Sequence, residues 1–262
     1  MEIYTNLVWP DDPYRTGQQL YRRPAPRLAA FTVCRTTCAS HPASTVAAIV
    51  YLPLHRTQTL AVTGETLAFG FHAASISREA GVPALAQVAD LDLMQARRHA
   101  AILAGHMLAG ELAALRALAP DAVLRGVTAV EREWADRSTP VKGRAVMLDC
   151  GLDLPGAASL AAACGQARIS VSDGVAFAVP EEPAAGELAT VVAVERALVI
   201  ALLSARHLGR YTWEGTLQAD EIMAAGAWDC FPHLHTGRPS AAADTEITRA
   251  GQPGHGVTLT GA

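Results

Sequence analysis

The residues best suited to acid–base chemistry stand at the end of a short β-type run. The segment RISVSDGVAFAVPEE (168–182) ends in Pro180, followed by Glu181 and Glu182. Because a proline fixes the backbone angle, this strand could aim Glu181 at a substrate rather than at solvent. Desolvation there would raise the pKa of the carboxyl group toward a value useful for a general base. The alternative is that both glutamates are solvated loop residues.

A second candidate site is the strand–turn–helix segment GRAVMLDCGLDLPGAASLAAAC (143–164). The helix after the Pro-Gly turn is built from very small side chains, so its first amide groups are accessible to a bound molecule. Such amides could stabilise negative charge developing on a carbonyl oxygen. The alternative is a tightly packed connection without chemistry.

Two clusters of thiols and imidazoles raise the question of a metal site. The clusters are Cys34, Cys38 and His41, and Cys230, His233 and His235. Neither spacing matches a common zinc pattern, and no second CxxC half is present. An odd count of five cysteines without framework spacing is typical of reduced thiols. We therefore expect no metal and a cytoplasmic protein.

Composition restricts the class of partner. The chain has 262 residues, of which 50% are hydrophobic, and a formal net charge of −4. No cluster of basic residues is visible along the sequence, so neither nucleic acid nor an anionic membrane is an expected partner. The N-terminus shows no secretory signal. The apolar run LATVVAVERALVIALLSA (188–205) is interrupted by Glu195 and Arg196, which favours a buried helix over a membrane span.

Periodicity predicts alternating strands and helices, typical of an α/β protein. The predicted strands are 27–33, 143–151 and 168–180, and 59–69 has β-type residues around a Thr-Gly turn. The predicted helices are 90–118, 120–137, 157–164, 186–208 and 217–226, and 42–52 is predicted as a short helix or a helix running into a strand. Residues 1–26 look irregular. We expect the tail, 237–262, to be disordered, because it is rich in Gly, Pro, Ala and Thr without periodicity.

Four segments, in this order, resemble the crotonase superfamily of enoyl-CoA hydratases and isomerases. They are TLAVTGETLAFGFHAAS (59–75), PVKGRAVMLDCGLDLPGAASLAAAC (140–164), RISVSDGVAFAVPE (168–181) and LQADEIMAAGAWD (217–229). The resemblance implies a ClpP/crotonase fold of repeated ββα units with C-terminal helices, over residues 27–236. Relative to that family, residues 77–139 are an extended helical insertion.

The resemblance also implies roles for individual residues. Two backbone amides would form the oxyanion hole: that of Phe71 or His72, and that of Gly156 or Ala157. Glu181 matches the catalytic glutamate that the family carries after a proline. The family's other glutamate position falls on Ser159, so the chain keeps a single acid–base carboxylate.

A single base implies isomerisation of an acyl-CoA, or of an acyl-carrier thioester, rather than two-glutamate hydration. Coenzyme A would then be part of the substrate, with no bound cofactor, in fatty acid or secondary metabolism. The family implies a homo-oligomer, a trimer or hexamer. Two alternatives stay open: a non-catalytic crotonase-fold subunit supporting a partner enzyme, and a Clp-type serine peptidase with Ser159 as the nucleophile.

Overall fold

Strand β2 (Arg27–Cys38) is the centre of the fold, and its side chains alternate between two buried faces. Leu28 and Ala30 pack into the hydrophobic core on one side of the sheet, and Ala29 and Phe31 pack into the core on the other. All four are fully buried, as in a strand covered by helices on both faces. The strand predicted over 27–33 is confirmed.

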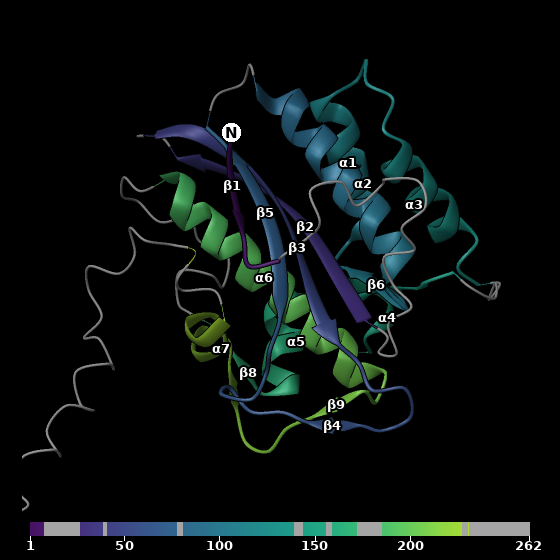
Figure 1. Cartoon of the computed structure of the whole chain (residues 1–262), viewed down its shortest axis with the longest axis vertical. Helices are drawn as coiled ribbons and strands as arrows, with labels where there is room; N and C mark the ends of the chain where they lie inside the picture. Colours follow the sequence, from purple (N-terminus) through teal and green to yellow (C-terminus); the bar gives the residue numbers. More distant parts are fainter. Residues whose placement is uncertain are drawn as a thin grey trace, which may run out of the picture.

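The computed structural model describes residues 1–7, 27–38, 41–77, 81–138, 144–155, 159–171, 185–226 and 230. Its main sheet has six strands in the order β1-β5-β3-β2-β6-β7 (Figure 1). Neighbours from β1 to β2 are antiparallel, whereas β2, β6 and β7 are parallel. The further strands of this sheet are β1 (Glu2–Thr5), β3 (His41–Pro53), β5 (Gly70–Ile76), β6 (Ile102–Gly105) and β7 (Val146–Asp149).

Helices cover both faces of this sheet, which makes an α/β protein of three layers (Figure 1). One face carries α1 (Val82–His99), α2 (Leu108–Leu118) and α3 (Arg125–Ala135). The other carries α4 (Cys150–Asp153), α5 (Leu160–Ala167), α6 (Ala185–His207) and α7 (Ala219–Gly226). Two short parallel pairs complete the described strands: β4 (Leu60–Ala61) with β9 (Tyr211–Thr212), and β8 (Ile169–Ser170) with β10 (Leu217–Gln218).

Helix α6 confirms the helix predicted over 186–208. Among the described residues it is the one helix long and apolar enough to cross a membrane, and 78% of its apolar window is buried inside the protein. The sheet and the other helices on the same face bury α6. Its apolar composition therefore equally fits a central helix of the hydrophobic core.

Two predictions of secondary structure are wrong. The continuous helix predicted over 90–118 is two helices, α1 and α2, separated by β6. All four β6 residues are buried, so ILAG has no polar alternation to distinguish a strand from a helix. The segment 42–52 is entirely strand, as part of β3, and the β-branched and small side chains from Ser44 to Leu52 are buried on both faces of the sheet.

The domain boundaries are only partly described. Residues 77–139, interpreted as a helical insertion, include β6, which is an inner strand of the sheet. The segment 59–69 contains only the two-residue strand β4, followed by a turn. Strand β1 lies within the segment predicted to be irregular, 1–26. The tail 237–262 and most of the strand predicted over 168–180 lie outside the described residues.

Substitution of Gly126 tests the close contact between α1 and α3. A Cβ atom there would lie 2.1 Å from the carbonyl oxygen of Asp90 and 2.9 Å from Cγ of Met94. Because the first neighbour is helix backbone, Gly126→Ala should destabilise the protein by about 1–3 kcal/mol in urea unfolding. The matched control is Gly165→Ala in α5, where no atom lies within 4 Å and a gain of up to about 1 kcal/mol is expected. Equal changes in the free energy of unfolding in the two variants would contradict the close contact between α1 and α3.

Candidate functional site at the carboxyl edge of the parallel strands

The candidate site lies at the carboxyl ends of β6 and β7, beside the middle of β2. The register pairs Ala30 with Ala104 and Gly105 with Asp149, so Thr32, His106 and Asp149 come to one edge. The chain leaves β2 toward β3 on one side and leaves β6 toward β7 on the other. Ligands of α/β sheets bind outside the carboxyl ends of parallel strands, and the ends of β6 and β7 are where His106 and Asp149 lie.

A buried carboxylate anchors this edge. Asp149 has no exposed surface, and its two oxygens accept hydrogen bonds from the amides of Met107, Leu108 and Gly151 at 2.8–2.9 Å. Met107 precedes α2 with a left-handed backbone, φ 57°. The carboxylate satisfies free amides at the start of α2 and offsets the cost of that conformation. Asp149 thereby fixes where the first turn of α2 lies.

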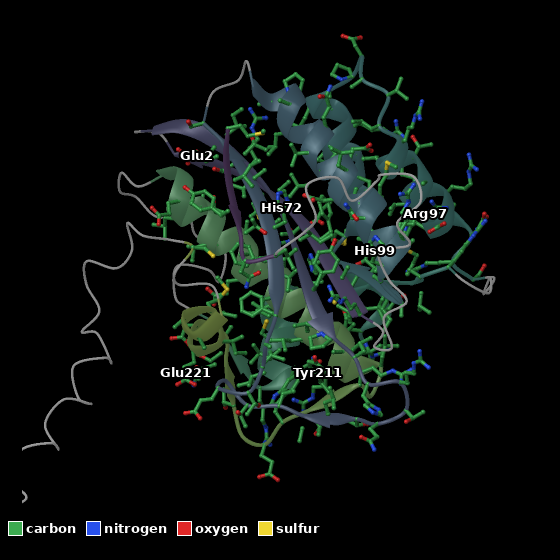
Figure 2. All side chains as sticks on the ribbon, viewed as in Figure 1. Glu2, His72, Arg97, His99, Tyr211 and Glu221 are labelled. Atoms are coloured by element: carbon green, nitrogen blue, oxygen red, sulfur yellow. The ribbon has the colours of Figure 1, made fainter. Side chains whose placement is uncertain are left out.

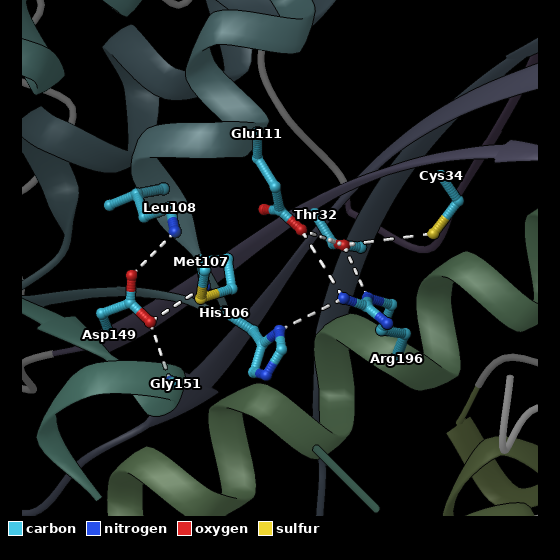
Figure 3. A network of polar contacts seen from close by, with 9 residues as sticks. All are labelled: Thr32, Cys34, His106, Met107, Leu108, Glu111, Asp149, Gly151 and Arg196. Carbon is cyan, nitrogen blue, oxygen red and sulfur yellow. Dashed lines mark hydrogen bonds and ion pairs between the residues drawn. The ribbon is translucent and has the colours of Figure 1, made fainter. Parts of the chain in front are cut away.

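That first turn carries Glu111, whose carboxyl group is buried against β2 (Figure 3). The Thr32 hydroxyl donates to Glu111 Oε1 at 2.8 Å. Glu111 Oε2 is buried and has no hydrogen-bond partner in the described part of the chain. Burial raises the pKa of Glu111 to about 8, although the Thr32 hydrogen bond and the Arg196 charge oppose the shift. Near neutral pH, Glu111 is therefore mostly protonated.

Arg196 reaches this edge from α6, on the other face of the sheet (Figure 3). Its Nε donates to Thr32 Oγ1 at 3.1 Å, and its Nη2 lies 3.4 Å from His106 Nδ1 and 4.0 Å from Glu111 Oε1. Burial and the Arg196 charge lower the pKa of His106, so this imidazole is neutral and its Nδ1 can accept. The Arg196 side chain is 23% exposed, which leaves part of the guanidinium open to solvent.

Cys34 borders the same cluster but is poorly suited to act as a nucleophile. Its Sγ lies 4.0 Å from Thr32 Oγ1. Burial raises the pKa of the Cys34 thiol, and the nearby Arg196 charge only partly offsets this effect. Since the thiolate is the reactive form, a thiol with a raised pKa is a weak nucleophile near neutral pH.

The structure gives the predicted oxyanion-hole residues other partners. The Phe71 amide donates to Asn6 Oδ1 at 2.7 Å, so this N–H is already used within the fold. His72 lies on β5 between β1 and β3, and its Nδ1 is 2.8 Å from Asp92 Oδ2 of α1 (Figure 2). Burial opposes the charge on His72, but the hydrogen bond and charge of Asp92 outweigh it and raise its pKa.

The remaining predicted site residues are described in part. Ser159 is the N-cap of α5, where its hydroxyl oxygen accepts a hydrogen bond from the Ala162 amide at 3.1 Å. Glu181, Gly156 and Ala157 lie outside the described residues.

The two thiol–imidazole clusters are also only partly placed. Cys34 belongs to the cluster described above, and Cys230 Sγ lies 3.5 Å from the carbonyl oxygen of Thr5. The side chains of Cys38 and His41, and all of His233 and His235, lie outside the described part. Within that part, no three His, Cys, Asp or Glu side chains are grouped to hold a metal ion.

No family model, curated protein or solved structure matches this chain. Its candidate site therefore rests on the geometry alone.

Sequence reasoning missed His106 and Glu111 because the helix predicted over 90–118 concealed β6. With β6 recognised, His106 directly follows a buried strand and Glu111 lies in the first turn of the next helix. Asp149 is the last residue of β7, within the strand predicted over 143–151, and was not singled out although functional side chains gather at such strand ends. Arg196 gave a signal of its own, since it interrupts the apolar run of α6 and a charge on a buried helix is seldom without a role.

Asp149→Asn should loosen the edge on which the site is built. The asparagine side chain has one acceptor oxygen and no negative charge, so it cannot accept all three backbone hydrogen bonds. The unfolding free energy should therefore fall by about 1–3 kcal/mol. Urea unfolding measures this, with the exposed Asp121→Asn as control. If both variants unfold at the wild-type midpoint, Asp149 does not anchor α2.

The raised pKa of Glu111 predicts how stability depends on pH. The folded protein holds this proton up to about pH 8, whereas an unfolded glutamate releases it near its ordinary pKa of 4.5. Stability should therefore be full below the unfolded pKa and fall as pH rises from 4.5 toward 8. The slope over that range should be about 1.4 kcal/mol per pH unit.

Glu111→Gln removes the titrating group and keeps an acceptor for Thr32. Urea unfolding at pH 5 and pH 8 should show a smaller loss of stability in this variant than in the wild type. Other buried groups titrate equally in both proteins, so the difference isolates Glu111. Identical pH dependence in the two proteins would show that Glu111 ionises normally.

Proposed function

We propose that the protein binds a small carboxylate-bearing molecule at this edge, with Arg196 contacting the carboxylate. The observation that carries the proposal is the partly exposed Arg196 guanidinium, held by Thr32 and His106 beside the buried carboxyl group of Glu111. Arg196 has its one ion pair among the described residues with Glu111, at 4.0 Å, and burial raises the pKa of that glutamate to about 8. Near neutral pH the guanidinium charge is thus not balanced by a full negative charge.

The neighbours of Arg196 support a ligand with one negative charge. Thr32 and the neutral His106 orient the guanidinium without neutralising it. A guanidinium has five N–H donors in a planar fork, and these two contacts leave donors available. A carboxylate matches this fork in geometry and, with one charge, matches it electrostatically.

Glu111 adds acid–base capacity to the same site. The pKa of this carboxyl group, about 8, is close to the pH at which the group would work. A match between pKa and working pH is the condition for efficient proton transfer. Its Oε2 has no partner among the described residues. Glu111 is therefore the group that would hold or transfer a proton beside a bound carboxylate, whereas the raised pKa of Cys34 disfavours covalent catalysis.

The acyl-CoA isomerase or lyase implied by the crotonase resemblance is a second proposal. The order of the four matching sequence segments favours it. Two observations make it the second choice: the Phe71 amide already donates to Asn6, and β6 and β7 enter the sheet singly rather than as repeated ββα units. Its thioester substrate, its trimeric or hexameric assembly and its cytoplasmic location belong to this proposal.

The two remaining alternatives have weaker support. A Clp-type peptidase would require Ser159 as a nucleophile, but in the described structure its hydroxyl caps α5. An auxiliary subunit would act through its surface on a partner enzyme, and would bind neither a carboxylate nor a CoA thioester.

The first proposal predicts carboxylate binding that depends on Arg196. Isothermal titration calorimetry with succinate and a panel of small mono- and dicarboxylates should find a ligand. Arg196→Gln should weaken it by about 10–100-fold, since a charge-assisted hydrogen bond contributes about 1.5–3 kcal/mol. Arg168→Gln, an exposed arginine at the C-terminus of α5, is the control. Wild-type affinity in Arg196→Gln would refute the proposal.

The pH dependence of this binding tests the role of Glu111. As pH rises through about 8, Glu111 ionises and competes with the ligand for Arg196, so affinity should fall. In Glu111→Gln this fall should be absent. If affinity falls equally in both proteins, Glu111 does not control the charge of the site.

The second proposal has a separate test with acetyl-CoA and other CoA thioesters. Turnover that is lost in Glu181→Gln, with binding retained, would support the single-base mechanism. Absence of any CoA thioester binding would end it without affecting the first proposal.

A further inference from the structure

Four arginines from three separate parts of the chain surround one cavity outside the candidate site. The cavity has a volume of about 260 Å³ and lies among the C-terminal turn of α1, the outer face of α3 and the segment just before β7. The arginines are Arg97, Arg125, Arg132 and Arg144. Because they are separated in sequence, no basic cluster is visible before folding.

One carboxylate lies beneath two of these arginines. Glu133 Oε1 accepts from Arg97 Nε at 2.7 Å and lies 3.8 Å from Arg144 Nε. The Glu133 side chain is only 5% exposed, whereas those of Arg97 and Arg144 are 40% and 42% exposed. Glu133 therefore holds these guanidinium groups in place from below while they face the cavity. Figure 2 shows Arg97 at the end of α1, beside α3.

The other two arginines are not balanced. Arg125 and Arg132 are exposed on α3, and their side chains form no ion pair or hydrogen bond with any residue in the described ranges. They are seven residues apart, two helical turns, so both lie on the face of α3 that lines the cavity. The cavity is thus lined by four guanidinium groups and only one carboxylate group.

This excess of positive charge is unusual for the protein as a whole, whose formal net charge is −4. Gathering like charges around one cavity raises the electrostatic energy of the folded state, and a bound anion would lower it. Thr128 does not offer its hydroxyl to a ligand, because that group donates to the Leu124 carbonyl and accepts from Arg116. Recognition at this cavity would therefore come from guanidinium groups.

We propose that this cavity binds the phosphate group of a small phosphorylated molecule. Phosphate carries the higher charge that an excess of guanidinium groups matches, and arginine forks bind its oxygens in bidentate pairs. The volume of about 260 Å³ is just below the usual range for drug-sized ligands, which favours a compact metabolite over a dinucleotide. The site is distinct from the Arg196 site, because α3 and α6 cover opposite faces of the sheet.

Calorimetric titration of the full chain with pyrophosphate and with glucose 6-phosphate, at low salt, tests this inference. Both should bind in the wild type. The double variant Arg125→Gln/Arg132→Gln should weaken binding at least 10-fold, because it removes the two guanidinium groups that have no other role in the described structure. The affinity of Arg125→Lys/Arg132→Lys should lie between those of the wild type and the Gln double variant, since lysine keeps the positive charge but lacks the planar guanidinium fork. The exposed Arg168→Gln, outside both sites, should bind as the wild type does.

Two results would overturn the proposal. One is unchanged affinity for the phosphates in the folded Gln double variant, and the other is that the wild type binds no phosphate at low salt. A third arm uses a single-stranded oligonucleotide. If it binds with a steep salt dependence and outcompetes both small phosphates, the cavity belongs to a nucleic-acid surface and the proposal is wrong. Thermal unfolding of each variant confirms that the comparison is between folded proteins.

Discussion

The carboxylate of Asp149 is the interaction on which the carboxyl edge of the sheet depends. It is fully buried, and it accepts from the two amides that begin α2 and from Gly151 in the next connection. An uncompensated buried charge would be costly, so the three amides are as necessary to Asp149 as Asp149 is to them. The end of β7 and the start of α2 are thereby fixed relative to each other.

The position of Glu111 follows from this anchor. Once α2 begins at Leu108, its first turn places Glu111 over β2, where Thr32 faces the α6 side of the sheet. Period-two alternation puts Thr32 on the same face as Leu28 and Ala30, and that is the face that α6 covers. Arg196 and Glu111 thus reach one threonine from opposite layers, without either helix crossing the sheet.

The sequence predicts the layers of this fold better than its site. The helices at 120–137 and 186–208 and the strands at 27–33 and 143–151 are confirmed in type because their patterns are long or bounded by Pro and Gly. Strand β6 was missed because its four residues are all buried and flanked by apolar helices, so helical and strand patterns coincide. Losing that one strand hid the parallel half of the sheet and the edge where His106 lies.

The two proposed anion-binding sites need not respond to solution conditions in the same way. At the Arg196 site the guanidinium is partly buried and its charge balance is set by one titrating carboxyl group, so pH controls the field that a ligand meets. At the arginine cavity the charges belong to guanidinium groups, and all four of these arginines are exposed to solvent. There mobile salt, rather than protons, is the main competitor, because screening acts most strongly on exposed charges. The physical distinction between the sites is thus burial: the same side chain, arginine, is governed by a neighbouring acid when it is enclosed and by ionic strength when it is open.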